Sequence, residues 1–319
     1  MNIFVMKFGG DCLSTPKNQE KAKEIINSFE GEKIVICSAM GRDGFPYSTS
    51  NLNKICLDDY ISNKERDRLL ANGEIISSIR MSYILNQNKI KSYALSYLEL
   101  GIICDDNYSN GNIIKLENNL NKYFDKYDVL LIPGFIGKTN NQEVITLGRG
   151  NADLTAVIYA SICNIKKVYL YKNVEGVFHT SPDVYKKLNK YDYLSFEQML
   201  LLNEIGFGIV SKKALIFAKE NNIDIEIKCF ENNSLGTLIS NKEKDDIFLG
   251  FNIVDKIVKV ASFQVINVSK IIKEELSKVH IFIKNEVIND NIYCFEINKS
   301  ILSNVKKVLI LVMNRVNKG

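Results

Sequence analysis

The sequence contains few of the patterns that metalloproteins, disulfide-rich proteins and membrane proteins need. It has only two histidines, His179 and His280, and neither has a second ligand at metal-binding spacing, so we expect no metal site built from protein side chains. The seven cysteines form no CxxC pair, which is typical of reduced thiols in a cytoplasm. No apolar run is long enough to span a membrane, and the short run after Met1 is broken at Lys7, too early for a secretion signal. These absences predict a cytoplasmic protein.

An excess of one charge is also missing. The chain has 41 lysines and arginines against 37 acidic residues, a net charge of +4, and the two signs are interspersed. A nucleic-acid-binding surface needs a basic patch or stripe, and none is visible. We therefore expect small molecules as ligands, and neither nucleic acid nor a membrane as a partner.

The pattern of apolar residues predicts two domains, as the length of 319 residues allows. Strands alternate with helices up to about residue 240, which predicts a three-layer α/β/α sandwich with a largely parallel sheet and ligands at the carboxyl ends of its strands. The predicted strands are 2–8, 33–37, 92–98, 129–132, 167–171 and 223–228. The predicted helices are 18–29, 64–86, 114–127, 154–163, 195–203 and 210–220.

A charged segment, residues 241–246, separates this part from a tail of different composition, and we interpret it as a hinge. The tail predicts strand 254–265, helix 269–279, strands 280–283 and 291–297, and helix 302–313. This order indicates a small α+β domain with an unpaired sheet face. We place the domains at residues 1–240 and 250–319.

Residues 131–153 contain the most informative pattern of the chain. Arg149 stands between Gly148 and Gly150, just before Asp153 and a predicted apolar helix. A guanidinium in this position can bind a carboxylate or phosphate with two hydrogen bonds, and Asp153 can bind a substrate amine. An ordinary tight turn, with Asp153 as the N-cap and Arg149 in solvent, explains these residues equally well.

Two further stretches contain residues suited to ligand binding. The first predicted strand ends at Gly9-Gly10 before a helix, a geometry in which backbone N–H groups bind phosphate, and Lys7 is placed to neutralise a transferring phosphoryl group. An ordinary β–α turn is the alternative. Gly73-Glu74 interrupts the pattern of helix 64–86, so this carboxylate can approach a ligand or can simply lie in solvent.

Seven motifs, in order, together resemble those of the aspartate kinases of the amino acid kinase family over about residues 1–240. They are KFGG (7–10), SAMGRDGFPYST (38–49), NGEIISS (72–78), GFIG (134–137), TLGRGNADLTA (146–156), NVEGV (173–177) and GTLIS (236–240). The tail resembles a single ACT domain, a regulatory unit of which this family usually carries two.

The resemblance implies an ATP-dependent kinase that phosphorylates the side-chain carboxylate of L-aspartate to 4-phospho-L-aspartate, the first step towards lysine, threonine and methionine. It implies catalytic roles for Lys7, Arg149 and Asp153. The implied substrate-binding residues are Ser38, Thr49, Glu74, Phe135, Arg149 and Gly150. The implied ATP-binding residues are Lys7, Gly9, Gly10, Lys172, Asn173, Lys212 and Lys213, with Mg²⁺ arriving on ATP and held by few protein groups. A homodimer through the ACT-like domain is also implied.

The sequence departs from the family pattern mainly on the ATP side. Asp11-Cys12 replaces Thr-Ser, Asn151-Ala152 replaces Gly-Ser, Lys172-Asn173 replaces Thr-Asp, residues 180–183 replace an ADPR motif, Phe207-Gly208 lacks the lysine of a GAKV motif, and residues 211–214 replace SPRA. Lys172, Lys212 or Lys213 can restore the lost positive charge; without it, ATP binding weakens by several decades.

Three hypotheses follow. The chain is a working aspartate kinase, or a silent homologue that binds an amino acid as a sensor or partner subunit, or an enzyme of the same fold with another carboxylate or carbamate acceptor.

Overall fold

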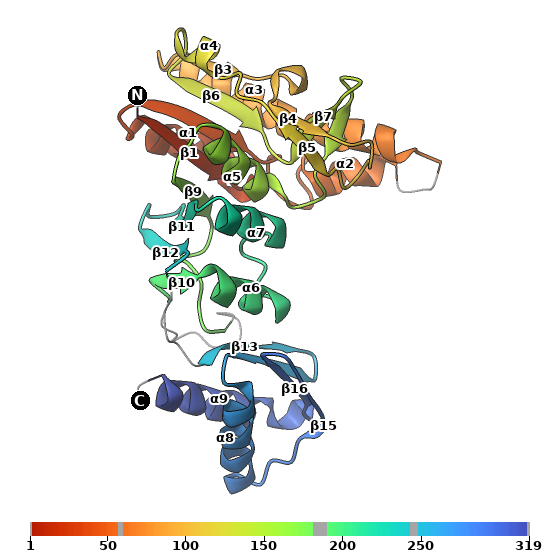
Figure 1. Cartoon of the computed structure of the whole chain (residues 1–319), viewed down its shortest axis with the longest axis vertical. Coiled ribbons are helices and arrows are strands. Elements are labelled where there is room, and N and C mark those ends of the chain that lie inside the picture. The colour runs from red at the N-terminus through yellow and green to blue at the C-terminus, as the bar shows by residue number, and fades with distance from the viewer. Residues whose placement is uncertain (1, 57–59, 181–189, 243–247, 318–319) are drawn as a thin grey trace. The chain divides into compact units, whose positions relative to one another are not determined.

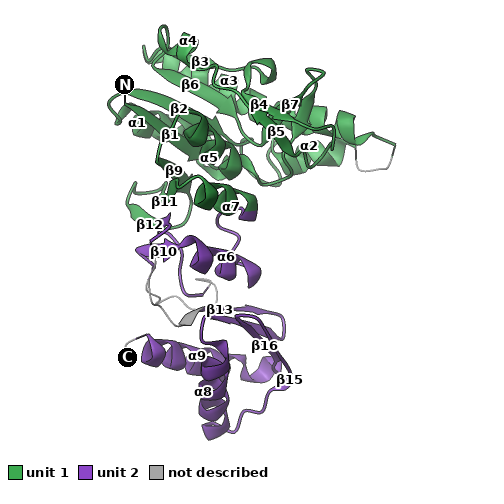
Figure 2. Ribbon diagram, in the orientation of Figure 1, with its two compact units in different colours: residues 1–175, 213–238 green, residues 176–212, 239–319 purple. Residues whose placement is uncertain are grey.

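The computed structural model describes residues 2–56, 60–180, 190–242 and 248–317 (Figure 1). The chain divides into two compact units, residues 1–175 with 213–238 and residues 176–212 with 239–319 (Figure 2). Residues 243–246 of the predicted hinge, and residues 181–183 of the altered ADPR motif, lie outside the described part. In the described residues, no helix combines the length and the apolar character that a membrane crossing requires.

Unit 1 is built on a sheet whose neighbouring strands run parallel wherever their pairing is defined, which confirms the predicted α/β fold. The order of the strands is β12 (Leu235–Ser240), β11 (Asp224–Cys229), β9 (Lys167–Lys172), β1 (Ile3–Phe8), β2 (Glu32–Cys37), β6 (Val129–Pro133) and β3 (Ser92–Ala94). The first strand of the sequence therefore lies inside the sheet, between β9 and β2.

Helices cover both faces of this sheet, as a three-layer sandwich requires (Figure 1). On one face, α1 (Pro16–Asn27) and α3 (Asn63–Gln87) pack over Met6 and Phe8 of β1 in a continuous apolar core. On the other, α5 (Ala152–Ile162) packs against β1, β2 and β9. Because side chains alternate along a strand, Lys7 lies on the α5 face, opposite its two apolar neighbours.

A second, four-stranded sheet lies in the same unit: β5 (Ile113–Leu116), β4 (Ile102–Cys104), β7 (Ile136–Thr139) and β8 (Val144–Thr146). The predicted helix 114–127 is wrong here. Its first residues pair with β4 as β5, and the following backbone is turned by Asn118 and Asn119, whose side chains bond Leu120 N–H and the Glu99 carbonyl. Only α4 (Asn121–Phe124) is helical.

Other boundaries in unit 1 also differ from the predictions. The predicted strand 92–98 stops at Ala94, because Ser96 and Glu99 form a capping box that starts the 3₁₀ turn η2 (Tyr97–Glu99). Helix α3 continues through Gly73 without a break. Two short helices complete the unit: η1 (Gly10–Leu13) and α2 (Thr49–Ile55), while α7 (Lys212–Glu220) begins at its boundary.

Unit 2 contains β10 (Tyr193–Ser195), α6 (Phe196–Glu204) and a small α+β region, as predicted for the tail. Its antiparallel sheet has the order β13 (Phe248–Val254), β14 (Ile257–Ser262), β16 (Ile292–Glu296) and β15 (Lys284–Asn289). Helices α8 (Val265–Lys278) and α9 (Leu302–Val316) share an apolar core with this sheet. The 3₁₀ turn η3 (Lys299–Ile301) precedes α9.

One predicted strand of the tail is confirmed in part and another is wrong. The predicted strand 254–265 contains β14, but its first residues belong to the β13–β14 hairpin turn at Asp255, which has a positive φ of 56°, and its last residue begins α8. The predicted strand 280–283 is wrong, because His280, with φ 56°, and Ile281 follow α8 directly and donate to carbonyls of its last turn. Such left-handed turns are hidden in the sequence because apolar residues stand on both sides of them.

Candidate functional site

The carboxyl ends of four strands meet at one edge of the main sheet. Phe8 at the end of β1 is in register with Cys37 of β2 and with Tyr171 of β9, and Cys37 is in register with Pro133 of β6. The loops that follow these strands therefore leave the sheet side by side. Ligands of open parallel sheets bind at this edge, so we place the candidate site here.

A cluster of two lysines and one aspartate lies at this edge. Lys7 Nζ is 2.9 Å from Asp153 Oδ1, and Lys172 Nζ donates a 2.7 Å hydrogen bond to Asp153 Oδ2. Lys7 and Lys172 lie on the α5 face of adjacent strands because both alternate with residues of the opposite core, and Asp153 reaches them from the first turn of α5. The helix-capping role for Asp153 is wrong, since Asn151 occupies the N-cap position.

The cluster is buried, and its charges shift each other's pKa values. Lys7 and Asp153 are 6% and 3% exposed. Burial acts to raise the pKa of Asp153, but the charges of Lys172 and Lys7 outweigh it and lower this pKa to about 2. Burial lowers the pKa of Lys172, and the Asp153 carboxylate opposes that change. Two ammonium groups therefore contact the same buried carboxylate.

The loops that follow β1 and β2 hold each other in place beside this cluster. Gly41 N–H donates to the Gly10 carbonyl at 2.9 Å, and a Cβ on Gly10 would lie only 2.5 Å from the Ala39 carbonyl oxygen. The carboxylate of Asp11, which is unfavourable near a phosphate, is paired with Arg42 at 2.5 Å. Gly9 N–H is engaged, because it donates to the Tyr171 carbonyl.

Glu74 reaches the site from the middle of α3, and glycines make its position possible. A Cβ on Gly73 would lie 2.7 Å from the Tyr47 carbonyl oxygen, and a Cβ on Gly134 would lie 3.1 Å from Glu74 Oε2. Glu74 is 3% exposed, and Oε2 forms no hydrogen bond of good geometry within the described part of the chain, although N–H groups of Ala39 and Gly134 lie nearby. Burial raises the pKa of Glu74 to about 8, against these N–H groups and the charge of Lys7.

The close packing around Gly134 gives a direct test of this part of the site. In Gly134→Ala, the new Cβ would lie 2.7 Å from Ala152 Cβ, so we expect a loss of about 1–3 kcal/mol in the free energy of unfolding. Urea denaturation measures it. The matched control is Gly208→Ala, because no atom lies within 4 Å of the Cβ position there. Equal stability of the two variants would contradict the packing described.

Arg149 lies in the loop that leads directly into α5. Its neighbours Gly148 and Gly150 have φ values of +93° and +84°, which side chains with a Cβ adopt only with strain. The Arg149 side chain is exposed, and Nη2 donates a 2.7 Å hydrogen bond to Ser50 Oγ in α2. Asn151 Nδ2 donates to the carbonyls of residues 147 and 148 and fixes the loop.

The remaining residues that the sequence predicts to bind substrate are Ser38, Thr49 and Phe135. Ser38 N–H donates to the Phe8 carbonyl, and Thr49 begins α2 after its cap Ser48. Phe135 is buried with a positive φ of 45°, a strained conformation for a bulky residue, and its N–H donates to Thr155 Oγ1 at 2.9 Å.

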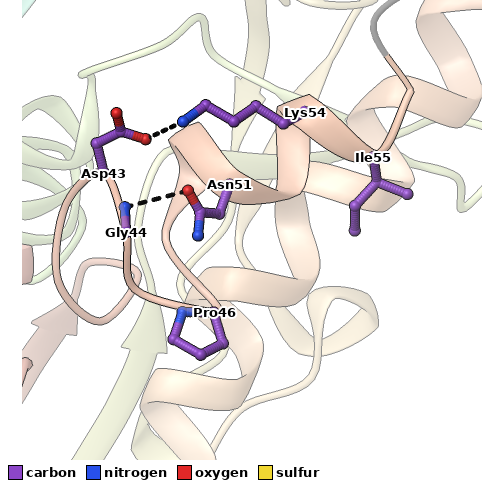
Figure 3. A pocket seen from close by; sticks show the side chains of 6 residues that line it. All are labelled: Asp43, Gly44, Pro46, Asn51, Lys54 and Ile55. Carbon is purple, nitrogen blue, oxygen red and sulfur yellow. Dashed lines mark hydrogen bonds and ion pairs between the residues drawn. The ribbon is translucent and has the colours of Figure 1, made fainter.

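A separate surface hollow of about 670 Å³ lies by the loop after β2 (Figure 3). Its walls include an ion pair between Lys54 and Asp43 and a 3.2 Å hydrogen bond from Gly44 N–H to Asn51 Oδ1. These contacts tie the loop to α2. None of the residues that line it belongs to the predicted site.

The predicted ATP-side residues divide into two groups. Lys172 belongs to the charge cluster, and the exposed Asn173 accepts a 3.6 Å hydrogen bond from the thiol of Cys12. Lys213 instead donates to Asn110 Oδ1 and to the Leu147 carbonyl, at 2.6 and 3.1 Å. Lys212 lies in unit 2 and is exposed, with Glu204 at 3.7 Å.

Sequence reasoning missed Asp67, a fully buried carboxylate on α3. It accepts hydrogen bonds from Ser109 N–H, Thr146 N–H and Thr146 Oγ1 at 2.8–2.9 Å, and so holds the second sheet against α3. A usable signal was present: Asp67, Ala71 and Glu74 have the i, i+4, i+7 spacing of one helix face, and all three are buried. Two acids on a buried helix face indicate specific partners for their carboxylates.

A three-layer α/β fold with a cationic cluster at the carboxyl edge of its sheet defines a class of proteins that bind anions there. The profile of the amino acid kinase family matches residues 2–229, and the chain belongs to this family. Among structures, E. coli aspartokinase III in complex with aspartate and ADP has a similar fold, with a TM-score of 0.68 and 16% identity over 93% of this chain and 79% of that one.

Curated relatives include aspartokinases. Aspartokinase 1 of Bacillus subtilis is 31% identical over 260 residues, which are 78% of this chain and 64% of the relative. The aspartokinase of Geobacillus stearothermophilus is 29% identical over 269 residues, 82% of this chain and 65% of the relative. The chain thus matches just under two thirds of the length of these relatives.

Proposed function

We propose that the chain is an aspartate kinase, an enzyme that transfers the γ-phosphoryl group of ATP to the side-chain carboxylate of L-aspartate and forms 4-phospho-L-aspartate, for lysine, threonine and methionine synthesis in the cytoplasm. The observation that carries the proposal is the buried Lys7–Asp153–Lys172 cluster, which places two lysines at the carboxyl edge of the sheet. The aspartokinase relatives support the choice of acceptor.

In the proposed reaction, two anions must come together. A carboxylate oxygen of aspartate attacks the γ-phosphorus, the bond from that phosphorus to the β–γ bridging oxygen breaks, and ADP leaves with the bonding electrons. The attacking group is already ionised, so no general base is needed. Positioning and neutralisation of charge therefore supply the rate acceleration.

On the phosphate side, Lys7 contacts the transferring group, and Asp153 holds Lys7 by an ion pair in the orientation that this contact needs. Gly9 and Gly10 keep the backbone close to the phosphates; since Gly9 N–H is bonded to Tyr171, the N–H groups that follow it are the available donors. Asn173 and Lys213 complete the ATP-binding set of the proposal within unit 1. Mg²⁺ enters on ATP, because the described residues offer no cluster of three metal ligands and both oxygens of Asp153 face lysines.

On the aspartate side, the Arg149 guanidinium donates two hydrogen bonds to a carboxylate, and the flanking Gly150 lets the ligand approach. Glu74 accepts the substrate ammonium. Since the pKa of Glu74 is about 8 in the ligand-free protein, the incoming ammonium favours loss of its proton. Ser38, Thr49 and Phe135 form the rest of the proposed pocket.

Hydroxylamine trapping tests the proposal. The protein with MgATP and L-aspartate is expected to form a hydroxamate, and Lys7→Met is expected to lower kcat about 100- to 1000-fold, as loss of a group that stabilises transition-state charge does. The control is Lys126→Met, which removes an exposed lysine. Aspartate binding by calorimetry without ATP binding or turnover would contradict a kinase, and turnover only with glutamate or carbamate would contradict aspartate as the acceptor.

The proposal includes a catalytic domain at residues 1–240, an ACT-like regulatory domain at 250–319 and a homodimer formed through the latter. The exposed edge strand β15, with Val287 60% exposed, supports such pairing. On gel filtration, the chain is expected to elute as a dimer, and both a chain ending at Ser240 and the full-length Val287→Asp variant as monomers. A dimer of Val287→Asp with an unchanged dissociation constant would contradict pairing through this strand.

A further inference from the structure

Asp67 is a fully buried carboxylate on α3 that the proposed reaction does not use. Its Oδ1 accepts a 2.9 Å hydrogen bond from Thr146 Oγ1, and its Oδ2 accepts 2.8 Å hydrogen bonds from the backbone N–H groups of Thr146 and Ser109. A buried carboxylate is stable only where hydrogen bonds replace its water, so these donors have a fixed place relative to α3. Thr146 is the last residue of β8, and the loop that contains Arg149 begins directly after it.

The short loop from Thr146 to Arg149 is held in shape by its own hydrogen bonds. The N–H group of Leu147 donates to the Phe135 carbonyl at 2.8 Å, and Asn151 Nδ2 donates to the Leu147 carbonyl at 3.0 Å. A shift of β8 along α3 would therefore move the backbone of Arg149 with it.

The Arg149 side chain is tied to the same helix by a second route. Nη2 donates a 2.7 Å hydrogen bond to Ser50 Oγ in α2, and α2 packs against α3. At Gly73 of α3, a Cβ would lie only 3.0 Å from Leu52 Cδ1 of α2, so the two helices are in close contact there. The next residue of α3 is Glu74, and both the loop and the side chain of Arg149 are thus placed relative to the helix that carries it.

Glu74 also lies beside the Arg149 loop. The Cβ position of Gly134 is 2.7 Å from Ala152 Cβ and 3.1 Å from Glu74 Oε2, so the carboxylate lies next to the first residue of α5, three positions after Arg149. Asp67 and Glu74 are seven residues apart on one unbroken helix, about 10 Å along its axis. The helix therefore acts as a rigid spacer between the anchor of the Arg149 loop and Glu74.

We propose that Asp67 is a positioning residue that selects the length of the amino-acid acceptor. The inference rests on the proposed function, in which Glu74 accepts the substrate ammonium. Since the side-chain carboxylate attacks phosphorus, the α-carboxylate is the one left for Arg149. Asp67 fixes these two binding groups relative to each other, so the side chain of the bound amino acid must end at the phosphoryl group. Glutamate is longer by one methylene, a difference that a fitted site discriminates about 10- to 200-fold.

The test compares kcat/KM for aspartate and for glutamate in the hydroxamate assay, with the full chain. We expect Asp67→Ala to lower the ratio of the two values about tenfold, because the clamp can then shift to accept the longer acid, and to leave KM for ATP nearly unchanged. Thr146→Val, which removes only the hydroxyl donor, is expected to lower the ratio about threefold. If Asp67→Ala does not fold, Thr146→Val decides.

Two variants separate positioning from other roles. In Asp67→Asn the amide oxygen can accept both backbone N–H bonds and the amide N–H can donate to Thr146 Oγ1, so we expect the parent ratio. Thr139→Val is the matched control: Thr139 is buried in the same sheet, and its hydroxyl accepts from the N–H groups of Asn141 and Glu143. It should lose stability but keep the ratio, because unfolding removes active molecules and lowers both rates in the same proportion.

An unchanged ratio in Thr146→Val and in folded Asp67→Ala would overturn the inference, and so would an Asp67→Asn variant as unselective as Asp67→Ala, or a parent chain that uses both acids equally. Failure of the proposed function has a different signature. If the parent chain forms no hydroxamate but binds aspartate in calorimetry, and Asp67→Ala and Thr146→Val weaken that binding while Thr139→Val does not, then the positioning role stands and the kinase assignment falls. If the parent chain does not bind aspartate, both fall.

Discussion

Replacing Asp153 with asparagine is expected to lower the free energy of unfolding by about 3–5 kcal/mol, the cost of leaving buried charges without their partner. The variant leaves the ammonium groups of Lys7 and Lys172 facing each other with no carboxylate between them. Urea denaturation at pH 7 measures the loss. Asp106→Asn, which changes an exposed aspartate of the same unit, is expected to stay within about 0.5 kcal/mol of the parent chain.

The pH dependence gives this prediction a second readout. The pKa of Asp153 in the folded protein is about 2, below its ordinary value of 3.8. The stabilisation from its charge is therefore complete above pH 3.8 and is lost as the pH falls towards 2. The difference between the parent chain and Asp153→Asn should stay constant from pH 5 to 8 and shrink below pH 4. Tripolyphosphate should stabilise the variant, because it supplies the missing negative charge. A loss below 1 kcal/mol at pH 7 would show that the two lysines do not depend on this carboxylate.

The second large predicted effect is the pH dependence of stability that Glu74 causes. It runs in the opposite direction to the pH dependence caused by Asp153. The pKa of Glu74 is about 8 in the folded protein, against an ordinary 4.5, so folding favours the protonated carboxyl. The stability from this group is complete below pH 4.5 and decreases as the pH rises to 8, by an amount on the order of 5 kcal/mol. Glu74→Gln cannot ionise. We expect it to match the parent chain at pH 5 and to be several kcal/mol more stable at pH 8.5.

Thermal unfolding across this pH range measures the effect, with Glu24→Gln on the exposed face of α1 as the control that keeps the parent profile. The same Glu74→Gln variant should bind aspartate more weakly, because a neutral amide replaces the proposed acceptor of the substrate ammonium. Gained stability at high pH together with lost affinity would show that this carboxylate is kept at a cost to the ligand-free fold. A Glu74→Gln variant whose stability depends on pH as strongly as that of the parent chain would rule the explanation out.

The fold could be predicted where the apolar residues are strongly periodic and glycines mark the ends of the elements. The strand before Gly9-Gly10, the alternation of strands and helices, and the helix after Asp153 all follow from local patterns. The failures share one physical cause. At Asp255 the chain turns inside a stretch that reads as one strand, and residues 113–116, which read as the start of a helix, are extended because they pair with β4. Such contacts come from distant parts of the sequence and leave no local signal.

The site also depends on contacts between distant parts of the sequence that no local pattern predicts. Motifs predicted that Lys7 and Asp153 belong together, and side-chain alternation assigns Lys172 to one face of its strand. What the sequence cannot show is that β9, not another strand, lies beside β1, which alone brings the two lysines to the same carboxylate. Asp67 was missed because a buried acid and a solvated one look alike until the partners of their oxygens are known.

The two faces of β1 make different contacts, since Met6 and Phe8 pack into the apolar core while Lys7, between them, pairs with Asp153 on the opposite face. Inserting or deleting one residue within this strand would exchange the two sets and place an aromatic ring where the ammonium now stands. Lengthening a loop beyond the end of the strand would leave both sets of side chains on their present faces. Variation in the length of proteins with this sheet should therefore accumulate after the strands, while the spacing inside the strands stays fixed.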